Sequence, residues 1–148
     1  MSTIYLDNAA TTKVREEVVD TISSVIKNEY GNPSSTHSYG RSSKSLIESS
    51  RKEIADILNV KTSEIIFTSG GTEGDNMIIR NCVNNLGVSH IITTKIEHHA
   101  VTHTIDDLIE SNNIKVSYVK VSKSGDVDLN NLEEILKRSD EKSLVSLM

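Results

Sequence analysis

The chain has 148 residues, of which 36% are hydrophobic and 25% are charged, and its formal net charge is −5. This acidic balance argues against a nucleic-acid-binding protein, because neutralising phosphates requires a basic surface. A single cysteine excludes a disulfide framework, and the lack of a signal peptide or of an apolar run of about 18 residues predicts a soluble, cytoplasmic, globular protein.

The first part of the chain predicts two helices joined by a turn. Apolar residues recur at helical spacing from Val14 to Ile26 and again from Ile47 to Leu58. Residues 31–36, which lie between the two stripes, hold the only proline and are rich in turn-forming residue types. We therefore expect residues 1–60 to form an N-terminal helical segment.

From residue 61 onward, short β-branched runs alternate with helical stripes. The runs lie at residues 65–68, 91–94 and 116–121, and a helical stripe follows each of them. Strand followed by helix, three times over, predicts an α/β fold with a mainly parallel sheet and flanking helices. Residues 144–148 predict the start of a fourth core strand, so we expect a truncated protein in which residues 61–148 form an incomplete α/β domain.

The strongest local indication of a ligand site is the glycine turn after the first run. Gly70 and Gly71 let a ligand approach the backbone closely, and the N–H groups of the following helix favour an anion such as phosphate. The Thr72 hydroxyl adds a donor. The segment matches neither the Walker pattern nor Gly-x-Gly-x-x-Gly, so it does not indicate a nucleotide. The alternative is an ordinary strand-to-helix turn that needs glycine for its geometry.

A second candidate site is the histidine cluster that follows the second run. His98 comes just after a strand end, where its side chain would lie over a ligand bound at the glycine turn. His99 and His103 share a helix face, but the zincin order is absent and no third ligand is evident, so we predict solvated histidines and no metal site. We predict that Cys82 is a small buried hydrophobe, because no basic cluster marks it as an activated thiolate.

Four segments together resemble the cysteine desulfurases, which are NifS/IscS-like pyridoxal-phosphate enzymes of the class V aminotransferases. The segments occur in the family's order and are Tyr5–Thr12, Gly31–His37, Ile66–Asn76 and Glu97–Val101. The resemblance implies part of the large domain of a fold type I, PLP-dependent transferase. The Gly-Asn-Pro-Ser-Ser stretch is similar to the branch that serves iron–sulfur cluster assembly and tRNA thiolation.

The resemblance also implies pyridoxal 5′-phosphate (PLP) as the cofactor and a role for three residues. Gly71 and Thr72 would hold the cofactor phosphate, and His98 would stack on the pyridine ring and act in catalysis. Relatives carry the Schiff-base lysine, the aspartate that pairs with the pyridine nitrogen and the nucleophilic cysteine beyond position 148. Cys82 does not match that cysteine, so we expect this chain by itself to be inactive.

The complete protein is therefore expected to convert L-cysteine to L-alanine and to hold the sulfur as a persulfide. The implied partners are L-cysteine, an iron–sulfur scaffold or tRNA-thiolation sulfur acceptor protein, and a second copy in a homodimer, without direct nucleic-acid or membrane contact. Two alternatives are another class V aminotransferase or lyase with a different substrate, and a non-enzymatic α/β domain that binds an anion.

Overall fold

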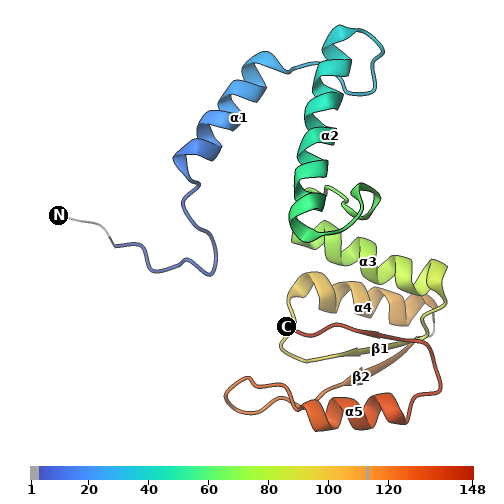
Figure 1. Cartoon of the computed structure of the whole chain (residues 1–148). Helices are drawn as coiled ribbons and strands as arrows, with labels where there is room; N and C mark the ends of the chain where they lie inside the picture. The colour runs from blue at the N-terminus through green and yellow to red at the C-terminus, as the bar shows by residue number, and fades with distance from the viewer. Residues whose placement is uncertain (1–3, 113) are drawn as a thin grey trace. The chain divides into compact units, whose positions relative to one another are not determined.

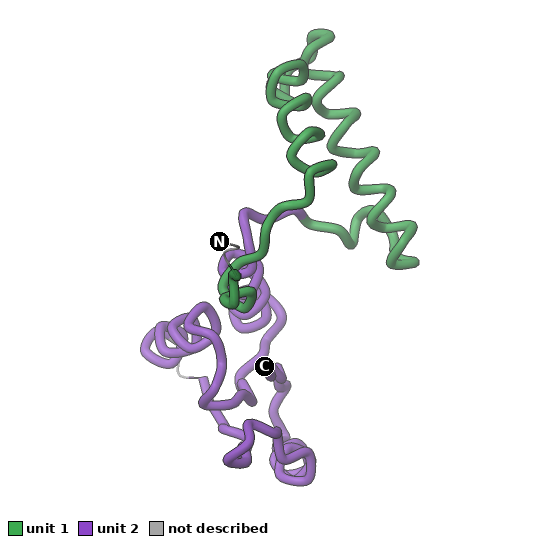
Figure 2. Tube along the Cα trace, turned by 90° about the vertical axis from the view of Figure 1, so that its left-hand side faces the viewer, with its two compact units in different colours: residues 1–66 green, residues 67–148 purple. Residues whose placement is uncertain are grey.

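A computed structural model of the chain describes residues 4–112 and 114–148 (Figure 1). The chain divides into two compact units, which comprise residues 1–66 and 67–148 (Figure 2). Among the described residues, no helix combines the length and the apolar character needed to cross a membrane.

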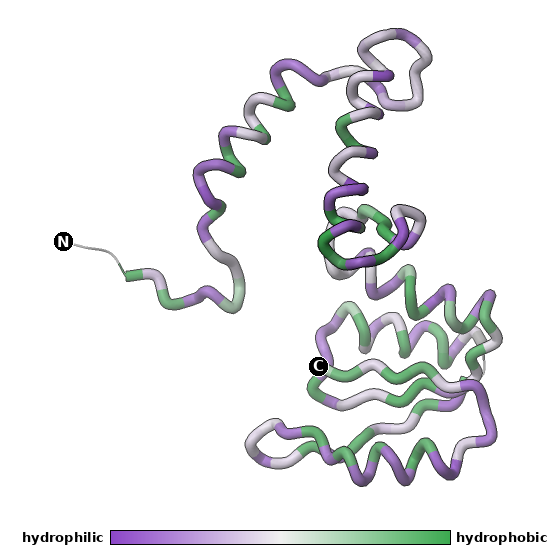
Figure 3. Tube along the Cα trace, in the orientation of Figure 1, coloured by the Kyte–Doolittle hydropathy of each residue, from purple (hydrophilic) through white to green (hydrophobic). Residues whose placement is uncertain are grey.

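The first unit is helical, as the apolar stripes predict. Its elements are α1 (Glu16–Asn28), α2 (Ser38–Leu58) and the 3-10 helix η1 (Thr62–Glu64). The ring of His37 accepts a hydrogen bond from the Gly40 N–H and so caps the start of α2. Apolar residues recur along both long helices (Figure 3). Many of these side chains are exposed, including Val18, Ile22 and Ile26 of α1 and Ile54, Ile57 and Leu58 of α2.

The turn between α1 and α2 is closely packed. A Cβ atom placed on Gly31 would lie less than 3.0 Å from the Tyr39 backbone, and one placed on Gly40 would lie equally close to the carbonyl oxygens of Asn32 and Ser35. Real Cβ atoms essentially never come so near to such groups. Both positions therefore require glycine because the backbone passes too close for a side chain.

The second unit is a small α/β structure. Its elements are α3 (Gly71–Leu86), β1 (His90–Thr93), α4 (His99–Asn112), β2 (Lys115–Tyr118), α5 (Leu129–Lys137) and β3 (Ser143–Val145). The strand order is β2-β1-β3, and both pairings are parallel. Helices α3 and α4 lie on one side of this sheet and α5 on the other (Figure 1). The predicted α/β class and parallel sheet are confirmed.

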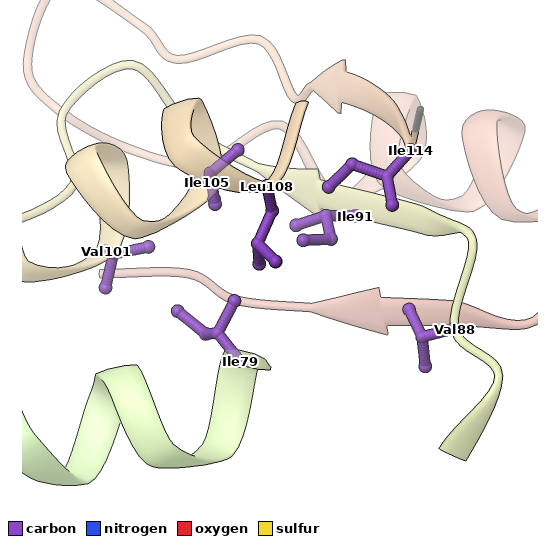
Figure 4. Close-up of a cluster of buried hydrophobic side chains, with 7 residues drawn as sticks. All are labelled: Ile79, Val88, Ile91, Val101, Ile105, Leu108 and Ile114. Atoms are coloured by element: carbon purple, nitrogen blue, oxygen red, sulfur yellow. The ribbon is translucent and has the colours of Figure 1, made fainter. Parts of the chain in front are cut away.

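The hydrophobic core of the second unit lies between the sheet and the helices α3 and α4 (Figure 4). Ile91 in β1 is completely buried, and Ile105 and Leu108 of α4 are almost completely buried. The other buried members of the cluster are Ile79, Val88, Val101 and Ile114. Cys82 packs against this core but is only half-buried, so it is less buried than the sequence predicts.

Two of the expected strands differ from the structure. The run at residues 65–68 is not a strand, because strand formation requires a neighbouring ladder, and the sheet formed by the described residues ends at β2 and β3. The run at residues 116–121 forms β2 only as far as Tyr118. Beyond that strand, Val121 makes an isolated antiparallel bridge with Val127.

Candidate functional site

Helix α3 begins directly after the glycine turn, so its N-terminus faces the site that the sequence predicts. The N–H of Gly74 is the first to bond back into the helix, to the Gly70 carbonyl at 3.1 Å. The N–H groups of Gly71, Thr72 and Glu73 therefore have no acceptor inside the helix. Together with the helix dipole, such groups favour the binding of an anion.

Neither glycine of the turn is required by the geometry of the turn itself. Gly70 has an extended backbone with φ 163°, which any residue can adopt. Gly71 is not among the described glycines whose φ lies in the left-handed region, which are Gly87 and Gly125. A Cβ atom placed on Gly70 or Gly71 would meet no heavy atom within 4 Å. This argues against a purely conformational need for glycine and leaves an open surface that a ligand can approach.

Glu73 holds the turn in place from the first turn of α3. Its Oε2 atom accepts a hydrogen bond from the Ser69 N–H at 2.6 Å, in the manner of a capping-box glutamate. Hydrogen bonding from the side chain and the backbone of Ser69 lowers the pKa of the Glu73 carboxyl group. The Ser69 N–H is thus already occupied, and an anion would be bound by Gly71 and Thr72 instead.

His98 ends the loop after β1 and caps α4. Its Nδ1 atom accepts a hydrogen bond from the Ala100 N–H at 3.0 Å, and its carbonyl oxygen accepts from the N–H groups of Val101 and Thr102. Because a backbone N–H donates to Nδ1, the neutral ring carries its proton on Nε2. The cap therefore fixes the tautomer and leaves Nε2 as the nitrogen that can donate to a ligand.

Thr72 and His98 line the same cleft, which has a volume of about 300 Å³ and lies between α3 and α4. Gly71 precedes Thr72 at the helix end but is not among the lining residues. The structure therefore brings two of the three predicted site residues together in one cavity. The other polar residues of the cleft come from facing sides of the two helices and are Asn76, Arg80, His99, His103, Thr104 and Asp107.

Polar contacts join the two walls of this cleft. The Arg80 Nη2 atom lies 2.7 Å from the Asp107 Oδ2 atom, and the Asn76 side chain donates to the Ala100 carbonyl oxygen at 3.4 Å. The Arg80–Asp107 ion pair is partly exposed and contributes at most about 1 kcal/mol. The sequence does not predict Asn76, Arg80 and Asp107 as site residues. A spacing of four nevertheless places Asn76 and Arg80 on the same helix face as Thr72.

The remaining histidines of the cluster lie along α4. The rings of His99 and His103 stack with their centroids 5.2 Å apart. Among the residues that the structure describes, no group of three His, Cys, Asp or Glu side chains could hold a metal ion.

Comparison with known proteins identifies the family. The family model for aminotransferase class V matches residues 4–148. The chain belongs to the class V aminotransferase family. This assignment confirms the family that the four sequence segments predict.

Individual class V relatives are cysteine desulfurases. The cysteine desulfurase of Dictyoglomus turgidum is 41% identical over 147 residues, which are 98% of this chain and 36% of the relative. That of Methanosarcina thermophila is 43% identical over 147 residues, with the same coverage. The chain thus spans little more than a third of the length of these curated relatives.

Solved structures give the same result for the fold. A NifS-like protein that is 38% identical matches 95% of this chain and 38% of its own length, with a TM-score of 0.83. The structure of SspA in complex with cysteine matches 98% of this chain and 42% of its own length, with a TM-score of 0.84 and 30% identity. The predicted fold class, part of a fold type I PLP-dependent transferase, is confirmed.

Proposed function

We propose that this chain is the N-terminal, cofactor-binding part of a PLP-dependent cysteine desulfurase. The observation that carries the proposal is that Thr72, at the open start of α3, and His98, at the start of α4, line one cleft. The identity with curated cysteine desulfurases over nearly the whole chain supports it. The complete protein would convert L-cysteine to L-alanine and hold the sulfur as a persulfide on a cysteine of its own.

The residues at the start of α3 fit the phosphate group of PLP. The N–H groups of Gly71 and Thr72 and the Thr72 hydroxyl would donate to phosphate oxygens, and the missing side chains of Gly70 and Gly71 leave room for close approach. The imidazole of His98 would stack on the pyridine ring. When bound, PLP supplies an electron sink for breaking the carbon–sulfur bond of cysteine.

His98 is also suited to moving a proton. Its Nδ1 atom is engaged by the Ala100 N–H, so the proton of the neutral ring resides on Nε2. Such a ring can donate this proton to a substrate group within reach and take it back later. The proposal therefore gives His98 a catalytic role in addition to stacking.

We also propose an organisation for the chain and partners for the complete protein. Residues 1–60 form a helical segment, and residues 61–148 form an incomplete cofactor domain. Cys82 is structural, because it packs against the core of the second unit. The complete enzyme would be a cytoplasmic homodimer that passes sulfur to an iron–sulfur scaffold or a tRNA-thiolation protein, while the chain alone would be inactive.

The deciding experiment is expression of the complete open reading frame that encodes this chain. We expect a product that absorbs visible light through bound PLP and forms one alanine for each sulfane sulfur that it takes from L-cysteine. Formation of alanine would be measured alongside turnover of other amino acids. Turnover of a different amino acid, without alanine from cysteine, would replace the proposal with another class V reaction. A product that binds no PLP would overturn it.

A further inference from the structure

The loop between β1 and α4 carries His98 at its end, and two of its residues, Thr94 and Glu97, face inward. Lys95, Ile96 and His98 are exposed, whereas Glu97 is half-buried. A glutamate that turns inward from an exposed loop requires a partner, because burying a carboxylate without a hydrogen bond is costly.

The partner of Glu97 lies just beyond β3. The Ser146 hydroxyl donates a hydrogen bond to the Glu97 Oε1 atom at 3.2 Å, in a half-buried position. The Ser146 N–H in turn donates to the Ile92 carbonyl oxygen at 2.9 Å, which holds Ser146 on the central strand. Glu97 is therefore linked, through a single serine, to the central strand of the sheet. A hydrogen bond to a carboxylate is stronger than one between neutral groups.

The residue directly after Glu97 is His98, so the backbone that Glu97 holds also sets the position of the imidazole. A second contact reports on that position. Ala100 is the second residue of α4, so its N–H has no acceptor within the helix, and it donates to the His98 Nδ1 atom instead. Protection of the Ala100 amide from hydrogen exchange thus measures how firmly His98 is held.

We propose that Glu97 is a positioning residue: its hydrogen bond with Ser146 fixes the loop that presents His98. The effect of Glu97 on catalysis rests on the proposed function, because His98 faces a cofactor only if that proposal holds. The hydrogen bond itself belongs to the chain and can be measured without cofactor.

The test is amide hydrogen exchange of the whole chain at single-residue resolution. Glu97→Ala and Ser146→Ala should each raise the exchange rate of Ala100 by about tenfold, and the double variant should add little, because both remove the same hydrogen bond. Glu97→Gln keeps the Oε1 acceptor and should restore slow exchange. Glu110→Ala removes an exposed carboxylate from α4, the helix that contains Ala100. It is the matched control and should leave the exchange rate of Ala100 unchanged. His98→Ala should also accelerate Ala100, which validates the measurement.

Three results would overturn the inference. The first is a Glu97→Ala variant in which Ala100 exchanges at the parental rate. The second is equal acceleration of the β1 amides, since the substitution would then act on general stability. The third is a parent chain in which Ala100 exchanges as fast as in an unstructured peptide, because the hydrogen bond would then not form.

A titration with 4-deoxypyridoxine 5′-phosphate separates this inference from the proposed function. This probe has the ring and the phosphate of PLP but no aldehyde, so it needs no lysine. If the exchange results hold and the probe does not bind, the proposed cofactor site fails and the positioning of His98 stands. If the probe binds and Ala100 does not respond to Glu97→Ala, the positioning role fails and the proposed function stands.

Discussion

The Nε2 atom of His90 lies 2.8 Å from the hydroxyl oxygen of Ser117, across the pair formed by β1 and β2. The Nδ1 atom of the same ring lies 2.8 Å from the Ser139 hydroxyl, and the residue is only 1% exposed. Burial lowers the pKa of His90, with a smaller contribution from the charge of Lys115 and an opposing one from Glu141. Burial in the folded unit therefore favours the neutral form of this imidazole.

We predict that His90 makes the second unit less stable in acid. Since the pKa of His90 is lower in the folded state, the unfolded chain takes up the proton first as the pH falls below about 6.5. The free energy of unfolding therefore decreases with falling pH until the pKa of the folded state is passed. The free energy of unfolding by urea should therefore fall more steeply with decreasing pH in the parent than in His90→Gln. The two proteins differ only at this position, so the difference between their pH profiles isolates His90. Parallel pH profiles would contradict the prediction.

Gly71→Val should abolish cofactor binding without unfolding the chain. The new side chain meets open space, and the φ of Gly71 does not lie in the left-handed region, so the fold should tolerate it. The same side chain would occupy the place where a phosphate approaches the N–H groups of α3. Circular dichroism would check the fold, and titration with 4-deoxypyridoxine 5′-phosphate would check binding. Parental affinity in this variant would remove Gly71 from the site.

Gly31→Ala should destabilise the first unit by about 1–3 kcal/mol, because the added Cβ overlaps the Tyr39 backbone. Gly70→Ala is the matched control, since its Cβ would meet nothing within 4 Å. Thermal unfolding monitored by the helical signal would compare the two variants. Equal lowering of the unfolding midpoint by both substitutions would contradict the close packing of Gly31 against the Tyr39 backbone.

Cys82→Ala should cost about 1–2 kcal/mol of stability, because it removes a half-buried sulfur from the edge of a hydrophobic core. In the complete enzyme, sulfur release per folded molecule should stay at the parental level. Sulfide production with a thiol reductant would measure it. Loss of sulfide release at unchanged stability would instead make Cys82 a participant in the chemistry.

His98→Ala should separate binding from catalysis in the complete enzyme. The phosphate contacts that we propose for Gly71 and Thr72 would remain, so the cofactor should stay bound, while single-turnover rates should fall by about 10²–10⁴-fold if the ring transfers protons. The cofactor absorbance and the rate of alanine formation would be measured together. A variant with the parental rate would refute the catalytic role.

The sequence predicts most of the second unit because its elements follow clear periodicities. The apolar stripe of α4 and the β-branched run of β1 are local patterns. The structure forms a helix and a strand at these positions, as the patterns indicate. The run at residues 65–68 carries the same kind of pattern and is not a strand. Pairing depends on which other strands lie alongside, and that information is not local.

The candidate site shows the same limit. Thr72 and His98 could be named because each lies at a helix start, where polar groups gather for a local reason. Asn76, Arg80 and Asp107 could not, since a helix face becomes the wall of a cleft only when another helix packs beside it. The need for glycine at position 31 likewise arises from the approach of Tyr39, eight residues away in the sequence.

The strand order β2-β1-β3 also determines when the sheet can form during protein synthesis. Both neighbours of β1 come later in the sequence, and Ser143, the register partner of His90, is separated from it by 53 positions. On the ribosome, β1 emerges first and must wait with both edges open until β2 and then β3 have been made. An apolar strand with open edges is prone to pairing with another chain. The most completely buried strand of the folded protein is therefore the one that most needs protection while the chain is being translated.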